Sequence, residues 1–363
     1  MTDKFELTMD TNSVHKWDIP AAIRDFVQNM LDNSNGYHWG YNEETETLSL
    51  TNYNTQLDRK VWLHGYSEKQ GDNSTRGCHG DGLKSSVAVL LREGCGITIY
   101  NGSLLWKPQR GYSETFQSDV VIVTEEENNV SWSDYTVEIT GITSFTMNQV
   151  ILNTLDFQDN VGQTYETEKA TILFDESQKG KVYCGGLFVG NFKSEYGFDF
   201  KPEHLELDRD RKSFDPFNVK WKCQDVWREY SGQDTEESSE VVISNLKNCE
   251  GSSEFLKYQN LPSENLNKAA EKVYTEEYSG KLVTSSYDEF NELKAAGNQV
   301  ELVKSEGLVN LIRKTESYQV VFEGKLSKKT PSELLESFKD KWYDEFSSEM
   351  LYDFEDMQSE IEK

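Results

Sequence analysis

The chain has 363 residues, and its formal net charge of −27 reflects an excess of carboxylates over lysine and arginine. This charge disfavours nucleic-acid binding, because attraction to a phosphate backbone depends on basic side chains. The five cysteines, at positions 78, 95, 184, 223 and 249, form no close pair, which indicates reduced thiols and no disulfide framework or zinc site. The start is polar and no apolar run approaches the roughly 18 residues of a membrane helix, so we expect a cytoplasmic protein without membrane contact.

Residues 20–32 are predicted to form a helix that carries a single polar row. Positions i, i+4 and i+7 of a helix share a face, so Asp25, Asn29 and Asp32 project together while the apolar side chains of this segment are buried. A solvated face of an amphipathic helix would show the same row. A functional row would supply an acid that orients water, an amide oxygen that binds a hard cation and a second, supporting acid.

Two further segments extend this pattern. Residues 47–51 alternate as a strand that ends at Asn52, and a polar turn containing Asn54 follows. A glycine-rich turn then leads into a helix predicted for residues 83–91, and its glycines are Gly77, Gly80 and Gly82. Backbone amides of such a turn, together with the positive end of the helix dipole, favour phosphate groups.

The glycine-rich turn has two other interpretations. A P-loop is excluded, because Leu83 stands where that motif needs lysine and the preceding segment is polar instead of a buried strand. A glycine-rich turn with no role in phosphate binding remains open for this segment taken alone.

The order of these segments resembles the Bergerat fold of the GHKL ATPases, the superfamily of gyrase B subunits, ninety-kilodalton heat-shock chaperones, MutL, histidine kinases and MORC proteins. Asp25, Asn29 and Asp32 fall on its ExxxNxxD motif, "NYNTQL" lies where DxGxG is expected, and the three glycines match GxxGxG. The "GYSEK" segment is similar to the serine-lysine segment of the chaperones and MORC proteins. The resemblance implies an α/β sandwich in which helices cover one face of a mixed sheet.

The resemblance also implies a role for each matching residue, with ATP and Mg²⁺ as ligands. Asp25 would be the general base, Asn29 the metal ligand, Asp32 a support acting through water and Asn52 the residue that reads adenine, with Asn54 in the same motif. The phosphates would be wrapped by Gly77, Gly80 and Gly82 and would attract two lysines, Lys69 and Lys84. For either lysine, a solvated surface position is the alternative.

Three departures from the family pattern affect these expectations. Asp25 is one methylene shorter than the usual glutamate, which favours slow hydrolysis or binding without turnover. Asn52 replaces an aspartate, so an acceptor oxygen is kept, the charge is lost and a donor is added. Asn54 and Gln56 replace flexible glycines, and we expect a stiffer turn.

The chain is expected to contain three domains. Residues 1–165 would form the ATP-binding domain and residues 166–235 a transducer-like α/β domain. In the second, "LELDRDRKSF" is similar to the chaperone segment that sends a basic residue to the terminal phosphate, so Arg209, Arg211 and Lys212 are the candidates; a charged surface turn is the alternative. Residues 236–363 would form an α/β region that ends in an acidic amphipathic helix.

The resulting expectation is a cytoplasmic, Mg²⁺-dependent ATP-binding protein and slow ATPase, in which ATP changes the binding of an unidentified protein partner or drives dimerisation. The alternative is a nucleotide-gated interaction module without hydrolysis, for example an inhibitor of a host protein, since small stand-alone members with this pattern resemble bacteriophage proteins. A histidine-kinase phosphotransferase ranks last, because none of the five histidines lies on a predicted dimerising helix.

Overall fold

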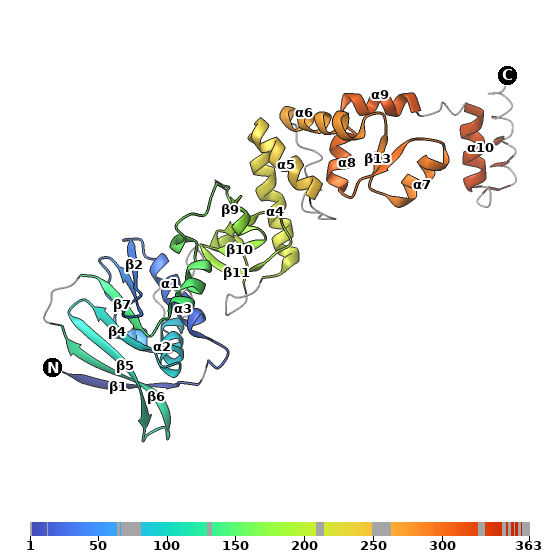
Figure 1. Ribbon diagram of the computed structural model, residues 1–363. Helices are drawn as coiled ribbons and strands as arrows, with labels where there is room; N and C mark the ends of the chain where they lie inside the picture. The colour runs from blue at the N-terminus through green and yellow to red at the C-terminus, as the bar shows by residue number, and fades with distance from the viewer. Residues whose placement is uncertain are drawn as a thin grey trace. The chain divides into compact units, whose positions relative to one another are not determined.

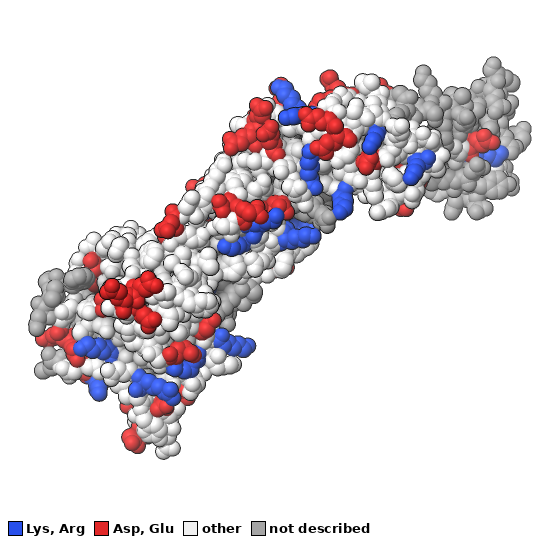
Figure 2. Space-filling model, viewed as in Figure 1, with Lys and Arg blue, Asp and Glu red and all other residues white. Residues whose placement is uncertain are grey.

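The computed structural model describes residues 2–12, 14–63, 66, 81–128, 133–207, 214–248, 263–325 and 331–342, together with single positions and pairs between 346 and 357. The chain divides into two compact units, Met1–Val226 and Trp227–Lys363, and both combine helices with strands (Figure 1). Within the described part, no helix has the length and apolar character needed to cross a membrane. On the visible face of each unit, basic side chains lie among acidic ones (Figure 2).

The first unit is built on a seven-stranded sheet with the order β1-β6-β5-β4-β7-β3-β2. Every neighbouring pair in this sheet is antiparallel. Its strands are β1 (Asp3–Asp10), β2 (Tyr37–Asn42), β3 (Thr47–Asn52), β4 (Gly96–Asn101), β5 (Leu104–Ser113), β6 (Ser118–Glu127) and β7 (Tyr135–Thr140). The strand predicted to end at Asn52 is therefore confirmed.

Three helices, α1 (Ile19–Leu31), α2 (Gly82–Arg92) and α3 (Ser144–Leu152), pack on one face of this sheet (Figure 1). The Asp18 side chain accepts a hydrogen bond from the Ala21 amide at the start of α1, and Pro20 lies in the first turn, where it is tolerated. The apolar residues of α1 and α2 enter one core with those of the strands. The helix predicted for residues 20–32 is confirmed to within one residue at each end.

The expectation of a mixed sheet is wrong for this sheet. β3 and β4 run in the same direction, as a crossover through α2 requires, but β7 lies between them and pairs antiparallel with both. Alternating polar and apolar residues identify a strand without fixing its neighbours, so the inserted strand could not be read from the pattern.

A second sheet of five strands lies in the same unit, with the order β11-β10-β12-β9-β8 and one parallel pair, β10 with β12. Leu187 of this sheet joins the core of the first sheet, and the bridge between Thr154 and Leu187 links the two regions. Lys169 forms an ion pair of 2.7 Å with Asp225 of helix α4. The elements are β8 (Thr164–Glu166), β9 (Ala170–Leu173), β10 (Lys181–Cys184), β11 (Leu187–Asn191), β12 (Gly197–Phe200) and α4 (Pro216–Ser231).

The second unit contains a parallel pair of strands joined through a helix. Arg313 donates to the Val283 carbonyl and to both carboxylate oxygens of Glu289, which ties β13 to α7 and to the end of α8. Helices and strands alternate here in the order α6, β13, α7, β14. The elements are α5 (Glu236–Asn248), α6 (Glu264–Val273), β13 (Leu282–Thr284), α7 (Tyr287–Ala295), β14 (Val300–Leu302), α8 (Glu306–Ile312), α9 (Glu316–Lys325) and α10 (Pro331–Trp342).

Candidate functional site

The polar row of α1 keeps partial access to solvent. Asp25 and Asp32 are half-buried and Asn29 is exposed, whereas Phe26, Val27 and Met30 beside them are buried. Asp32 is the C-cap residue, and its backbone N–H donates to the Gln28 carbonyl. The Asn29 side chain forms no hydrogen bond with the described residues, so its amide oxygen is available to an external cation.

Asp25 lies directly against Gly82, the first residue of α2. A methyl group placed on Gly82 would lie 2.5 Å from Oδ2 of Asp25 and 3.2 Å from its Cγ. The carboxylate therefore occupies the space that any side chain at position 82 would need. Two motifs that are far apart in the sequence meet here, and the carboxylate lies at the positive end of the α2 dipole.

The first turn of α2 is not capped by its own N-cap residue. The Asp81 side chain forms no capping hydrogen bond, and it lies 3.7 Å from the ammonium of Lys84. Because the first amides of a helix lack partners within the helix, this end of α2 is suited to an anionic ligand.

Lys84 points into the protein. Its side chain is 2% exposed, and its Nζ donates to the carbonyls of Val61 (3.1 Å) and Leu63 (2.8 Å) at the end of η1 (Arg59–Trp62). Burial lowers the pKa of Lys84, and the nearby Asp81 carboxylate partly offsets this shift. The ammonium would have to leave these carbonyls to reach a phosphate, so the phosphate contact of Lys84 stays a prediction while its structural role is visible.

Asn52 ends β3 in a defined orientation. The residue is 6% exposed, and its Nδ2 donates to the Met30 carbonyl of α1 at 3.1 Å. A carbonyl only accepts hydrogen bonds, so the amide nitrogen must face Met30 and the amide oxygen must face away. Oδ1 accepts no hydrogen bond from the described residues. The donor that distinguishes asparagine from aspartate is thus used inside the protein.

The turn after β3 is held by three asparagines, of which only Asn54 was expected in this region from the sequence. Asn54 has a φ of +47°, a left-handed conformation that asparagine tolerates, and its N–H donates to Asp134 at 2.9 Å. Asn35 donates to the Asn54 carbonyl, and Asn33 donates to the Gly36 and Tyr53 carbonyls. Asn33 and Asn35 directly follow the helix predicted for residues 20–32, and asparagines at such a position are typical of turns.

Several predicted site residues lie outside the described part of the chain: Lys69, Gly77, Gly80, Arg209, Arg211 and Lys212. Among the described residues, no group of three or more histidine, cysteine, aspartate or glutamate side chains is placed to hold a metal ion. Magnesium commonly takes one or two protein ligands and completes its shell with phosphate oxygens and water, so a site with Asn29 as a protein ligand is chemically compatible with this arrangement.

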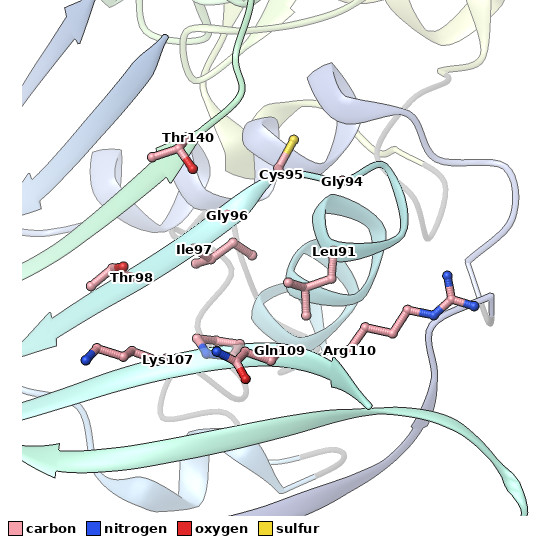
Figure 3. Close-up of a pocket in the computed structure, with 11 residues that line it drawn as sticks. Leu91, Gly94, Cys95, Gly96, Ile97, Thr98, Lys107, Gln109, Arg110 and Thr140 are labelled. Atoms are coloured by element: carbon pink, nitrogen blue, oxygen red, sulfur yellow. The ribbon is translucent and has the colours of Figure 1, made fainter. Parts of the chain in front are cut away.

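A hollow of about 420 Å³ lies between β4 and β5, at the opposite end of α2 (Figure 3). Gly82 and Leu91 are separated by about 14 Å along the helix axis, at roughly 1.5 Å per residue. The hollow exists because β4 and β5 separate: their register ends at Ile99 and Trp106, and Pro108, which has no N–H to donate, would come opposite Ile97.

The lining of this hollow does not form a catalytic centre. In Figure 3 the side chain of Leu91 projects from α2, and that of Arg110 extends away from the strands. Lys107 and Arg110 form ion pairs with Glu126 and Asp119. Burial raises the pKa of the neighbouring Cys95 thiol to about 11, so the thiol is protonated and unreactive at neutral pH.

No protein-family model matches this chain, and no curated protein is significantly similar to it. The assignment of a function therefore depends on the residues and geometry described above.

Proposed function

We propose that this chain binds ATP with Mg²⁺ at the junction of α1, β3 and α2, hydrolyses it slowly, and uses it to change its affinity for a protein partner or for a second copy. The observation that supports this proposal most is the contact between Asp25 and Gly82. It brings a carboxylate on a half-buried helix face to the start of another helix, which its own N-cap residue, Asp81, does not cap through its side chain. The resemblance to the GHKL motifs predicts that Asp25 and Gly82 lie close together, whereas their separation in the sequence does not require it.

In this proposal, adenine, the phosphates and the metal each have a candidate partner in this region. The Oδ1 atom of Asn52 is suited to accept a hydrogen bond from the amino group of adenine, because Met30 fixes the orientation of the amide. The first amides of α2 are suited to the phosphates, and Asn29 is suited to Mg²⁺. Asp25 would orient the attacking water.

Electrostatics makes binding dependent on the metal. The Asp25 carboxylate lies at the helix end that would receive the phosphates, so two negative groups would share one positive helix end. A divalent cation between them offsets this repulsion. We therefore expect Mg²⁺ to strengthen binding itself, in addition to any effect on hydrolysis.

The second candidate is a nucleotide-gated interaction module that does not hydrolyse ATP. The short side chain of Asp25, packed against Gly82, favours this candidate, because a carboxylate held at the helix end has less reach toward an attacking water. Both candidates share the binding step and differ only in turnover.

The deciding experiment uses the full chain. Titration calorimetry with ATP, in Mg²⁺ and in EDTA, measures binding, and a phosphate-release assay on the same sample measures turnover. Metal-dependent binding with slow release supports the ATPase, whereas binding without release supports the gated module. Absence of binding in Mg²⁺ would reject both. Sedimentation with and without ATP then tests whether the nucleotide drives dimerisation.

A further inference from the structure

Strand β2 forms one edge of the seven-stranded sheet, with β3 as its neighbour. The Tyr53 amide donates to the Gly36 carbonyl, and in an antiparallel pair the backbone groups alternate between the two sides. The N–H and C=O groups of Trp39 and Tyr41 therefore point away from β3. Among the described residues, none forms a hydrogen bond with these outward groups.

This edge is held rigidly by its aromatic side chains. The Tyr37 hydroxyl donates to Asp156, and the Tyr41 hydroxyl donates to the Ile142 carbonyl at 2.7 Å. The Trp39 ring stacks on Phe157, with 4.2 Å between the ring centroids. An incoming strand would thus meet a preformed template, which reduces the loss of conformational freedom on binding.

The two edge strands of the sheet differ in the features that prevent the addition of another strand. β1, at the other edge, carries several charged residues, and its register shifts between Glu6 and Asp10. Charges and bulges of this kind discourage pairing with another chain. β2 has the sequence YHWGYN, without a charged residue, a proline or a register shift. Space is also open at its centre, where a methyl group on Gly40 would approach only the His38 ring, at 4.0 Å.

Carboxylates lie at both ends of β2. Asp156 is exposed beside Tyr37 at the start of the strand, and the exposed residues Glu43, Glu44 and Glu46 follow Asn42 at its end. A strand with basic residues at both ends would complement these charges. A second copy of the chain is disfavoured as the occupant, because each copy carries a net charge of −27.

We propose that the β2 edge binds an extended segment of a partner protein by strand addition, and that this segment is uncharged in its centre and carries lysine or arginine at each end. The outward N–H and C=O groups of Trp39 and Tyr41 supply the main-chain hydrogen bonds. Glu43, Glu44, Glu46 and Asp156 select the flanking charges. This interaction does not depend on nucleotide binding.

The test uses a synthetic probe, acetyl-Lys-Thr-Val-Thr-Val-Lys-amide, and amide hydrogen exchange of the full chain measured by NMR. In the free protein the Trp39 and Tyr41 amides exchange rapidly, while those of His38 and Gly40 are protected by β3. The probe protects Trp39 and Tyr41 and leaves the other two unchanged. A probe N-methylated at alternate residues binds at least about tenfold more weakly, because its main-chain donors are blocked.

Charge selection is tested with a probe that has glutamate in place of both lysines, and with the triple variant Glu43→Gln, Glu44→Gln and Glu46→Gln. Both changes should weaken binding several-fold at low salt, and the control Glu114→Gln, at an exposed position between β5 and β6, should leave it unchanged. Equal binding of the N-methylated probe, or absence of protection at Trp39 and Tyr41, would overturn the proposal. Protection of these amides that rises with protein concentration alone would assign the edge to a second copy instead.

Discussion

The Asp25 carboxylate fills the volume that a side chain on Gly82 would occupy, so the identity of residue 82 controls the position of residue 25. The backbone of Gly82 is not in the left-handed region, which means that alanine there would introduce no backbone strain. The two residues therefore allow a local test of the proposed site, in which a single methyl group displaces the carboxylate while the fold is kept.

Gly82→Ala is expected to weaken Mg²⁺–ATP binding by at least tenfold, about 1.4 kcal/mol, because the added methyl group and the displaced Asp25 carboxylate would take up space that the phosphates need at the start of α2. Alanine is a better helix former than glycine by up to about 1 kcal/mol, so little stability should be lost. Calorimetry measures the affinity and thermal unfolding measures the stability. Gly40→Ala is the matched control, and equal affinities of the two variants would contradict the role of the contact.

Asp25→Asn should abolish phosphate release and keep, or raise, the affinity for ATP. The amide cannot accept a proton from water, and the loss of one negative charge at the helix end reduces repulsion of the phosphates. Phosphate release and calorimetry are measured on the same sample, with Asp159→Asn, at an exposed position, as the control. Turnover retained in Asp25→Asn would show that another residue activates the water.

Asn52→Asp introduces the residue that the GHKL ATPases carry at the matching position of their motif, and we expect it to destabilise this protein by about 1 to 3 kcal/mol at neutral pH. The carboxylate would face the Met30 carbonyl without a proton to donate. Its pKa in the folded state would therefore rise, and stability would fall as pH increases through that value. Urea unfolding at pH 5 and pH 8 measures this effect. A larger loss of stability at pH 5 than at pH 8 would contradict the expected rise in the pKa of the new carboxyl group.

Lys84→Met should lower the free energy of unfolding by about 1 to 3 kcal/mol, because the carbonyls of Val61 and Leu63 lose their donor in a buried place. Burial lowers the pKa of Lys84 in the folded state, so at alkaline pH the unfolded chain binds more protons than the folded chain. The contribution of this lysine to stability should thus rise with pH as its folded pKa is passed. Urea unfolding of both proteins at pH 7.5 and pH 9.5 gives the difference, and a difference independent of pH would argue against a buried ammonium.

Cys95 is expected to resist iodoacetamide in the folded protein at pH 8, because its pKa is about 11 and its side chain is buried. Peptide mapping by mass spectrometry after labelling, with and without urea, measures this protection. Rapid labelling of Cys95 in the native state would show that the hollow beside it opens further than the structure indicates.

Local signals in the sequence were sufficient for the elements that form the site. The period of apolar residues placed α1 to within one residue, and alternation placed the strand that ends at Asn52. These features depend on neighbouring residues only. The contact between Asp25 and Gly82 could not be predicted from such local signals, because it depends on how two helices pack on a common sheet.

Contacts between segments far apart in the sequence could not be predicted from the local pattern of polar and apolar residues. The insertion of β7 between β3 and β4 makes the sheet antiparallel, and no residue within β3 or β4 encodes it. The hydrogen bond from Asn52 to Met30 requires the end of α1 to lie across the end of β3. The buried position of Lys84 follows from η1, which packs beneath the start of α2 and was not predicted from the sequence.

The position of β7 also sets an order for folding during synthesis. β3 and β4 flank the proposed site, and each must wait for residues 135–140 before its ladder with β7 can form. A nascent chain that ends before Thr140 exposes two strand edges in the middle of its largest sheet, where they can pair with other chains. This late strand therefore has to be synthesised before the proposed nucleotide-binding region can become stable, and the interval before it emerges is when the protein is most exposed to aggregation.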